Sequence, residues 1–151
     1  MDLNKEEYII LEIIPTAIHP SKGDIIQLQA LKLKGIELID RFDYRLKEDK
    51  ILIPQFLDII SYDKEQFTYK DSTKEIINEF KKWTNNKPLL ILNNTYTNNY
   101  LEELPNKKED ILKYLNMEYT DNIIEEIIKK YQLEPSNHIV DLLYESIIKS
   151  I

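Results

Sequence analysis

The chain has 151 residues, of which 42% are hydrophobic and 31% charged, and its net charge is −7. This length and composition predict one globular domain over residues 1–151, and the absence of cysteine excludes disulfides and thiolate zinc sites. No apolar run reaches the roughly 20 residues of a membrane helix, and the acidic N-terminus does not resemble a signal peptide. We therefore expect a cytoplasmic protein.

The lysines are spread along the chain and balanced by acidic residues, so the sequence shows no concentrated basic patch. Proteins that hold a nucleic-acid backbone usually present such a patch. The charge pattern therefore disfavours a nucleic-acid ligand. It does not exclude one, because a bound metal ion can also recruit a phosphate group.

The first third of the chain predicts three strands in an antiparallel meander. Residues 8–13 are apolar and rich in β-branched isoleucine except for Glu12, an acid that is costly to bury without a partner and so marks a possible site. In residues 25–33, apolar side chains alternate with mainly polar ones, which is typical of a half-buried antiparallel strand. In residues 37–46, apolar side chains again recur at even spacing, which predicts the third strand.

Helices dominate the rest. Ile53 and Pro54 are expected to open a short helix, and Ser72 with Glu75 forms a capping-box pattern before a second helix. Residues 89–92 are a short apolar run that predicts a strand parallel to the first one, reached through a helical crossover.

Four further helices are expected over residues 97–104, 109–115 and 121–131 and from Pro135 onward. The complete pattern predicts an α/β fold. Its centre is a mixed sheet, made of a three-strand antiparallel meander plus a parallel strand, and helices flank that sheet.

Four segments follow one another in an order that resembles a known family. They are residues 22–33, which begin with a Gly-Asp turn, residues 53–61, the Leu-Asn-Asn run at 92–94, and residues 133–141. Together they resemble the DnaQ-like 3′–5′ exonucleases of the DNA polymerase III epsilon type, also called DEDD exonucleases. The resemblance covers nearly the whole chain and implies a ribonuclease H-like fold.

The resemblance also implies which residues occupy the positions of the catalytic site. In this family four carboxylates hold two divalent ions, which activate a water and stabilise the leaving oxygen. The first acid falls on Glu12, and its partner falls on Ile14. The third falls on Asn98, or on Thr97 if the loop is one residue shorter, and only the last is kept, as Asp141.

The family's general-base histidine falls on Ser136 in this chain. His138 is a possible replacement, since helical spacing would place it on the face of Asp141, although a half-exposed place at the helix start is the simpler expectation. His19 is expected on the surface. With Glu12 and Asp141 as the two remaining candidate metal ligands, we expect no catalytic residues, no metal and no cofactor.

The leading hypothesis is therefore a catalytically inactive exonuclease-like domain that acts as a binding or regulatory module, through a protein partner in a nucleic-acid-processing complex. One alternative is a divergent 3′–5′ exonuclease that acts on DNA or RNA with Mg²⁺ or Mn²⁺. Its site would use Glu12, Asn98, His138 and Asp141. Another alternative is a non-catalytic nucleic-acid binder. Residues 93–99 are polar and form either a turn closed by asparagine side chains or a rebuilt pocket for an uncharged ligand.

Overall fold

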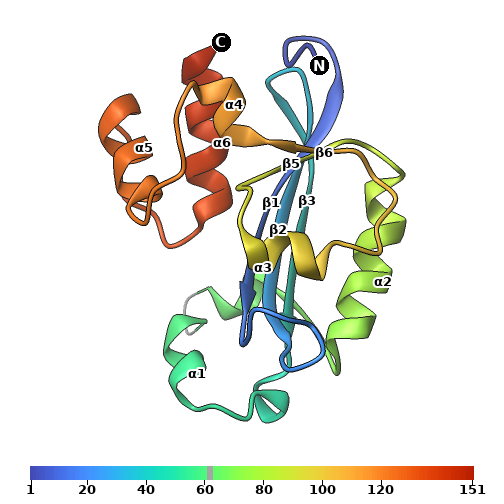
Figure 1. The fold of residues 1–151 in the computed structure, drawn as a ribbon. Coiled ribbons are helices and arrows are strands. Elements are labelled where there is room, and N and C mark those ends of the chain that lie inside the picture. The colour runs from blue at the N-terminus through green and yellow to red at the C-terminus, as the bar shows by residue number, and fades with distance from the viewer. Residues whose placement is uncertain (61–62) are drawn as a thin grey trace.

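In the computed structural model, which describes residues 1–60 and 63–151, six strands form one mixed sheet in the order β4-β3-β2-β1-β5-β6 (Figure 1). The strands are β1 (Glu7–Pro15), β2 (Ile25–Lys34), β3 (Glu37–Leu46), β4 (Thr68–Lys70), β5 (Leu89–Ile91) and β6 (Lys108–Asp110). The helices are α1 (Gln55–Ile59), α2 (Thr73–Thr84), α3 (Thr95–Tyr100), α4 (Ile111–Leu115), α5 (Ile123–Tyr131) and α6 (Ile139–Ser150). Two short 3-10 turns are η1 (Glu48–Lys50) and η2 (Lys64–Gln66).

The predicted meander is confirmed. Strand β1 pairs antiparallel with β2, from Glu7 opposite Lys34 to Ile14 opposite Gln27, and β2 pairs antiparallel with β3. Strand β5 lies parallel to β1 after the crossover through α2, as expected. The capping box of α2 also forms, since the Ser72 hydroxyl accepts a hydrogen bond from the Glu75 backbone amide.

Two strands were missed, and one of them corrects a helix prediction. Residues 109–115 are not all helical, because Lys108–Asp110 is strand β6, parallel to β5, and α4 begins only at Ile111. Strand β4 likewise lies parallel to the end of β3. Three-residue strands show little periodicity of their own, and their pairing depends on neighbours that are distant in the sequence.

Two other helices begin and end at different residues from those predicted. Helix α3 begins at Thr95, because the Asn94 side chain caps it by accepting a hydrogen bond from the Thr97 amide, and it ends at Tyr100, well before Pro105. Helix α6 begins at Ile139 rather than near Pro135. The side chain of Ile59 and the residue Ser61, both within the segment 53–61, lie outside the described residues.

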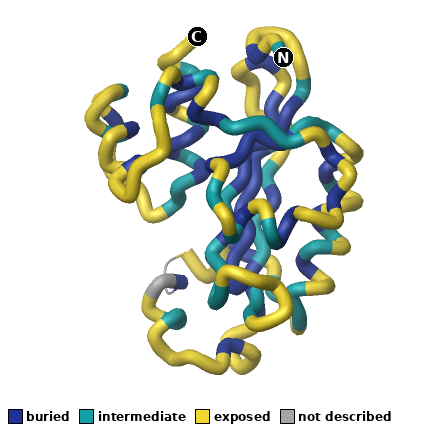
Figure 2. Tube along the Cα trace, in the orientation of Figure 1, coloured by how far each residue is buried: buried dark blue, intermediate teal, exposed yellow. Residues whose placement is uncertain are grey.

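The two faces of the sheet are covered by different helices. Figure 1 shows α2 on one side and the group of α5 and α6 on the other, and Figure 2 shows that burial is concentrated on the strands between them. Ile9, Leu11 and Ile13 of β1 pack in one hydrophobic cluster with residues of α2, whereas Tyr8 and Ile10 pack in a second cluster with residues of α4, α5 and α6.

Strand β2 is buried on both faces, so the prediction of a half-buried strand is wrong. Even Gln27 and Gln29, which alternate with its apolar residues, are almost fully buried. The reason is that His138, at the start of α6, contacts Gln29 on the second face and is itself held by Asp63. Among residues 1–60 and 63–151, no helix combines the length and the apolar character needed to cross a lipid bilayer.

Candidate functional site

Toward the Pro15 end of β1, the sheet face that α6 covers changes from apolar to polar. Tyr8 and Ile10 are buried in the apolar cluster, but the next residue on that face is Glu12. Opposite Glu12 on β2 lies Gln29, and opposite Gln29 on β3 lies Asp43. The position of the first family acid is therefore surrounded by polar side chains of the neighbouring strands.

The central feature of this polar region is Arg41. Its Nη1 donates a hydrogen bond to Asp141 Oδ1 of α6 at 3.0 Å, and its Nε donates to Asp43 Oδ2 at 3.2 Å. Gln29 Nε2 donates to the other oxygen of Asp43 at 2.9 Å. Burial alone would lower the pKa of Arg41, but its hydrogen bonds to the two carboxylates outweigh that effect and raise the pKa. The carboxylate of Asp141 is thus already paired with a cation of the protein.

The same set of hydrogen bonds continues along β2 and β3. Arg45 Nε donates to Gln27 Oε1 at 2.7 Å, and Gln27 Nε2 donates to Gln29 Oε1 at 3.1 Å. The Arg45 guanidinium is fully buried and lies over the ring of Phe67, 3.6 Å from its centroid. We call Gln27, Gln29, Arg41, Asp43 and Arg45, together with His138, Asp141 and Asp63, the polar network.

His138 joins the polar network at the N-cap of α6 rather than on the helix itself. Its Nδ1 lies 3.1 Å from Gln29 Oε1, and its Nε2 lies 2.5 Å from Asp63 Oδ2. Both ring nitrogens therefore face acceptor oxygens, an arrangement that holds the ring in place and leaves neither nitrogen directed at a substrate. Ser136, the position of the family's histidine, is exposed, and its hydroxyl accepts a hydrogen bond from the His138 amide. His19 is exposed, as expected.

Glu12 is half-buried and makes no hydrogen bond or ion pair with any residue that the structure describes. Burial raises the pKa of Glu12 to about 8, so the carboxyl group is mainly neutral at pH 7. Ile14, two residues further along β1, packs against the hydrophobic cluster that contains Ile9, Leu11 and Ile13. The first strand thus supplies one neutral carboxyl group and one hydrocarbon side chain where the family has two carboxylates.

The third acid position is also changed. Asn98 is exposed on α3, and its Nδ2 donates to Asn93 Oδ1 at 2.7 Å, whereas Thr97 is buried and directs its backbone amide to Asn94. Asparagine side chains close local hydrogen bonds, as one of the two expectations for residues 93–99 held, but residues 95–99 belong to helix α3 and not to a turn. Residues 93–96 and Asn98 also line a pocket, and that this pocket receives an uncharged ligand stays a prediction.

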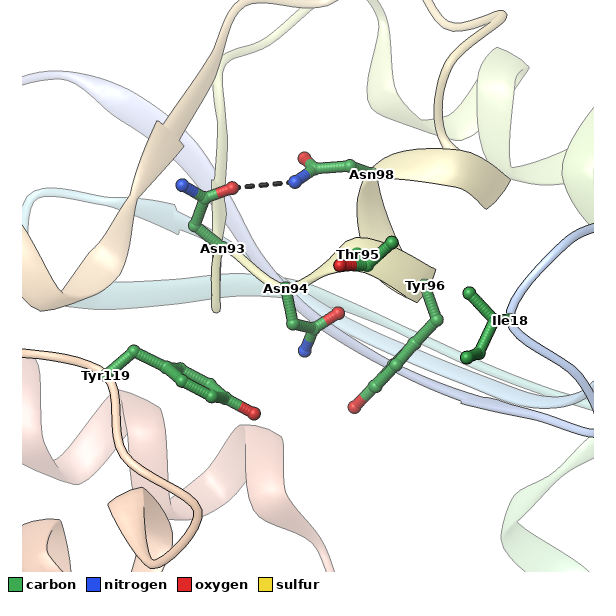
Figure 3. Close-up of a pocket in the computed structure, with 7 residues that line it drawn as sticks. All are labelled: Ile18, Asn93, Asn94, Thr95, Tyr96, Asn98 and Tyr119. Atoms are coloured by element: carbon green, nitrogen blue, oxygen red, sulfur yellow. Dashed lines mark hydrogen bonds between the residues drawn. The ribbon is translucent and has the colours of Figure 1, made fainter.

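This pocket is open to solvent, has a volume of about 510 Å³ and is lined by Ile18, residues 93–96, Asn98 and Tyr119 (Figure 3). None of these side chains carries a formal charge. In Figure 3 the amide of Asn94 lies between the side chains of Tyr96 and Tyr119, whose hydroxyl groups point toward the same opening. Burial, with a smaller contribution from the nearby Glu12 carboxyl, raises the pKa of Tyr96 to about 12, so this hydroxyl stays neutral.

The residues at the family's four acid positions do not fit a pair of divalent ions. Such ions need several oxygen ligands, usually with carboxylates among them. The positions hold a neutral carboxyl group, an isoleucine, an exposed amide and a carboxylate that is paired with Arg41. Across the described parts of the chain, no group of three or more His, Cys, Asp or Glu side chains is arranged to hold a metal ion.

Sequence reasoning missed the residues that hold Asp141, namely Arg41 and its partner Asp43, which also accepts a hydrogen bond from Gln29. A signal was present, since Gln27 and Gln29 alternate along one strand and Arg41, Asp43 and Arg45 alternate along the next. The pattern marks a polar sheet face. It does not reveal that α6 covers this face or that Arg41 reaches across to Asp141.

Comparison with known proteins supports the resemblance found in the sequence. No protein-family model matches the chain. The chain is 21% identical to DNA polymerase III PolC-type of Staphylococcus haemolyticus and 22% identical to that of Bacillus subtilis, over 91% and 90% of its own length. It spans only 10% of the length of these polymerases.

Solved structures of exonuclease I match over nearly the whole chain. An apo form gives a TM-score of 0.60 with 13% identity, covering 97% of this chain and 42% of that one. The Escherichia coli enzyme bound to a dT13 oligonucleotide gives 0.56 with 13% identity, covering 97% and 40%. The chain has the fold of exonuclease I. The predicted exonuclease fold and the resemblance to DnaQ-like exonucleases are thereby confirmed.

Proposed function

We propose that this exonuclease-like domain is catalytically inactive and acts as a binding or regulatory module, through a protein partner, in a complex that processes nucleic acid. The observation that carries the proposal is the contact of Arg41 with both Asp141 and Asp43. A guanidinium of the protein is paired with the only acidic side chain that keeps the family's residue type and position.

A divalent ion at Asp141 would have to displace this guanidinium from the Asp141 carboxylate while Asp43 holds it in place. Asp43 is largely buried, with 9% of its side chain exposed, so breaking its pair would leave a poorly solvated charge. A metal ion would also need the Glu12 carboxyl in its charged form, which burial disfavours. Both effects oppose two-metal catalysis.

The choice of a protein partner rests on charge. The net charge of −7 repels a phosphate backbone, and the pocket beside Glu12 contains no cation to attract one. The likeness to DNA polymerase III PolC-type and to exonuclease I, which has been solved with single-stranded DNA and with SSB, supports a nucleic-acid-processing setting. That setting rests on similarity of fold and sequence.

The test is a nuclease assay. End-labelled single-stranded DNA and RNA are incubated with the wild-type protein and with Mg²⁺ or Mn²⁺, and we expect no shortening. Glu12→Ala and Asp141→Ala variants, purified in the same way, report any contaminating nuclease. Metal-dependent shortening that both substitutions abolish would overturn the proposal. Salt-sensitive binding of the oligonucleotide without cleavage would replace the protein partner by nucleic acid.

A further inference from the structure

We propose that the pocket lined by Ile18, residues 93–96, Asn98 and Tyr119 receives an uncharged peptide segment of the partner protein, with one aromatic or branched aliphatic side chain packed on the exposed rim residues Ile18 or Tyr119. This inference rests on the proposed binding role and names the site at which binding occurs. The pocket lies where β5 ends and where the loop after β1 passes, which is the edge at which ligands commonly bind in sheets with parallel strands.

The charge of the lining selects among ligand classes. In a chain with 31% charged residues, the lining contains three asparagines, a threonine, two tyrosines and an isoleucine, none of them charged. A phosphodiester would find no lysine or arginine there, and a basic or acidic peptide would lose solvation without gaining an ion pair. An uncharged peptide meets neither penalty.

The hydrogen-bonding groups of the lining suit a peptide backbone. Asn98 uses its amide nitrogen on Asn93 Oδ1, so the Asn98 oxygen and the Asn93 nitrogen remain available for a ligand. Asn94 uses its oxygen to cap α3, and its amide lies in the opening between the two tyrosines (Figure 3). Side-chain amides offer the same donor and acceptor types as the backbone amides of a peptide.

The rim of the pocket supplies apolar contact area. Ile18 is 57% exposed and Tyr119 is 48% exposed, although both are large apolar or aromatic residues. Tyrosine and asparagine are also the residues that antibody loops favour for protein recognition, because tyrosine gives a large rigid contact and asparagine gives adaptable hydrogen bonds. Tyrosine is further enriched among the residues that dominate binding energy at interfaces.

The loop that carries Ile18 is fixed before any ligand arrives. Asn99 Nδ2 donates to the Ile18 carbonyl at 3.1 Å, and the Tyr100 hydroxyl donates to the Ala17 carbonyl at 3.0 Å. Both donors belong to α3, so one side of the rim is held to the helix that carries Tyr96. A preformed pocket reduces the entropy lost on binding, which favours recognition of a short segment.

The experiment uses a phage-displayed library of random dodecapeptides, which is panned against the wild-type protein. The enriched sequences are expected to be poor in charged residues and to share one aromatic or branched aliphatic residue. A synthetic enriched peptide is then titrated into wild-type protein, into Tyr119→Arg and into Leu52→Arg. Leu52 is 89% exposed and does not line the pocket, so this matched control adds the same charge elsewhere.

We expect Tyr119→Arg to weaken binding at least about tenfold and Leu52→Arg to leave it unchanged. Enrichment of charged peptides, failure to enrich any sequence, or equal binding to Tyr119→Arg would each overturn the inference. Oligothymidylate is a second probe, and its displacement of the peptide would make the pocket a nucleic-acid site. The nuclease assay is independent of the peptide experiment. A protein that cleaves no nucleic acid and selects no uncharged peptide would refute the peptide site and leave the proposed inactivity standing.

Discussion

The two faces of the sheet use the same strands in different ways. On the face of α2, alternate residues of β1 are Ile9, Leu11 and Ile13, and they pack without interruption against residues such as Phe80. On the face of α6, the apolar sequence stops at Ile10, and beyond it the strands carry carboxyl, amide and guanidinium groups. The two faces share the same backbone pairing and twist. They differ only in the side chains, which point alternately to one face and to the other.

This comparison separates the scaffold from the chemistry that it supports. The apolar face needs only complementary shapes for its packing to stabilise the fold. The polar face must balance charges inside the protein, and here Arg41 balances Asp43 and Asp141 with a group that is fixed to β3. Under the proposed function, the fold is retained, and the guanidinium of Arg41 takes the place of the divalent ions that catalysis would require.

Phe80→Ala should give the largest loss of stability. Phe80 is fully buried on the α2 face and packs edge-to-face on Phe42, with ring centroids 5.2 Å apart. Truncating a buried phenylalanine to alanine leaves a cavity and typically costs about 4 kcal/mol, which urea denaturation measures. Lys81→Ala, an exposed change on the same helix, is the control and should stay within roughly 0.5 kcal/mol. A small loss for Phe80→Ala would show that this face does not hold the fold.

Glu12→Gln should give the second largest effect, and its sign depends on pH. Burial raises the pKa of Glu12 from 4.5 to about 8, so the folded state binds a proton that the unfolded state has released. The wild type therefore loses stability as pH rises from the lower value to the higher one, and Gln, which stays neutral, removes this dependence. Each pKa unit corresponds to about 1.4 kcal/mol, and after discounting for partial exposure we expect Glu12→Gln to be roughly 2–3 kcal/mol more stable at about pH 9.

The measurement for Glu12→Gln is urea denaturation at several pH values, and near about pH 4.5 the variant and wild type should agree. Glu125→Gln is the matched control, because Glu125 is exposed on α5 and its replacement should add no comparable pH dependence. If Glu12→Gln were instead less stable than the wild type at high pH, Glu12 would be an ionised and partnered residue, and the neutral reading of the first strand would be wrong.

The two faces also differ in how far the sequence predicts them. The sequence predicts the meander, the crossover to β5 and helix α2 from the spacing of apolar residues and from helix capping. Each of these signals is local to its element. The assignment of the four acid positions follows from the resemblance and from the order of its segments, and it stays a prediction. The pair of Arg41 with Asp141 does not follow from the sequence, since these residues are 100 positions apart and meet only when α6 docks. Short strands such as β6 fail for the same reason.

Arg41→Met should destabilise the polar face by about 2 kcal/mol, because it leaves the carboxylates of Asp43 and Asp141 close together without their cation. Adding Asp43→Asn to this variant should recover roughly half of the loss, and the double-mutant cycle then gives the coupling energy of the pair. Arg41→Lys, which keeps the charge but not the two-sided geometry, should fall between wild type and Arg41→Met. A neutral or stabilising Arg41→Met would show that charge balance is not what holds this network.

Asp141→Asn should have the smallest effect, roughly 0.5 kcal/mol, because Asp141 is 34% exposed and Arg41 keeps its second partner. Asp43→Asn, at a nearly buried position, should lower the free energy of unfolding more than Asp141→Asn does. That result would show that Arg41 is held mainly by β3 rather than by α6. Thermal unfolding with and without Mn²⁺ completes the test. If Asp141 were a metal ligand, Mn²⁺ would stabilise the wild type and Asp141→Asn would lose that stabilisation. We expect Mn²⁺ to change the unfolding temperature of neither protein, because the Asp141 carboxylate is already paired with the guanidinium of Arg41.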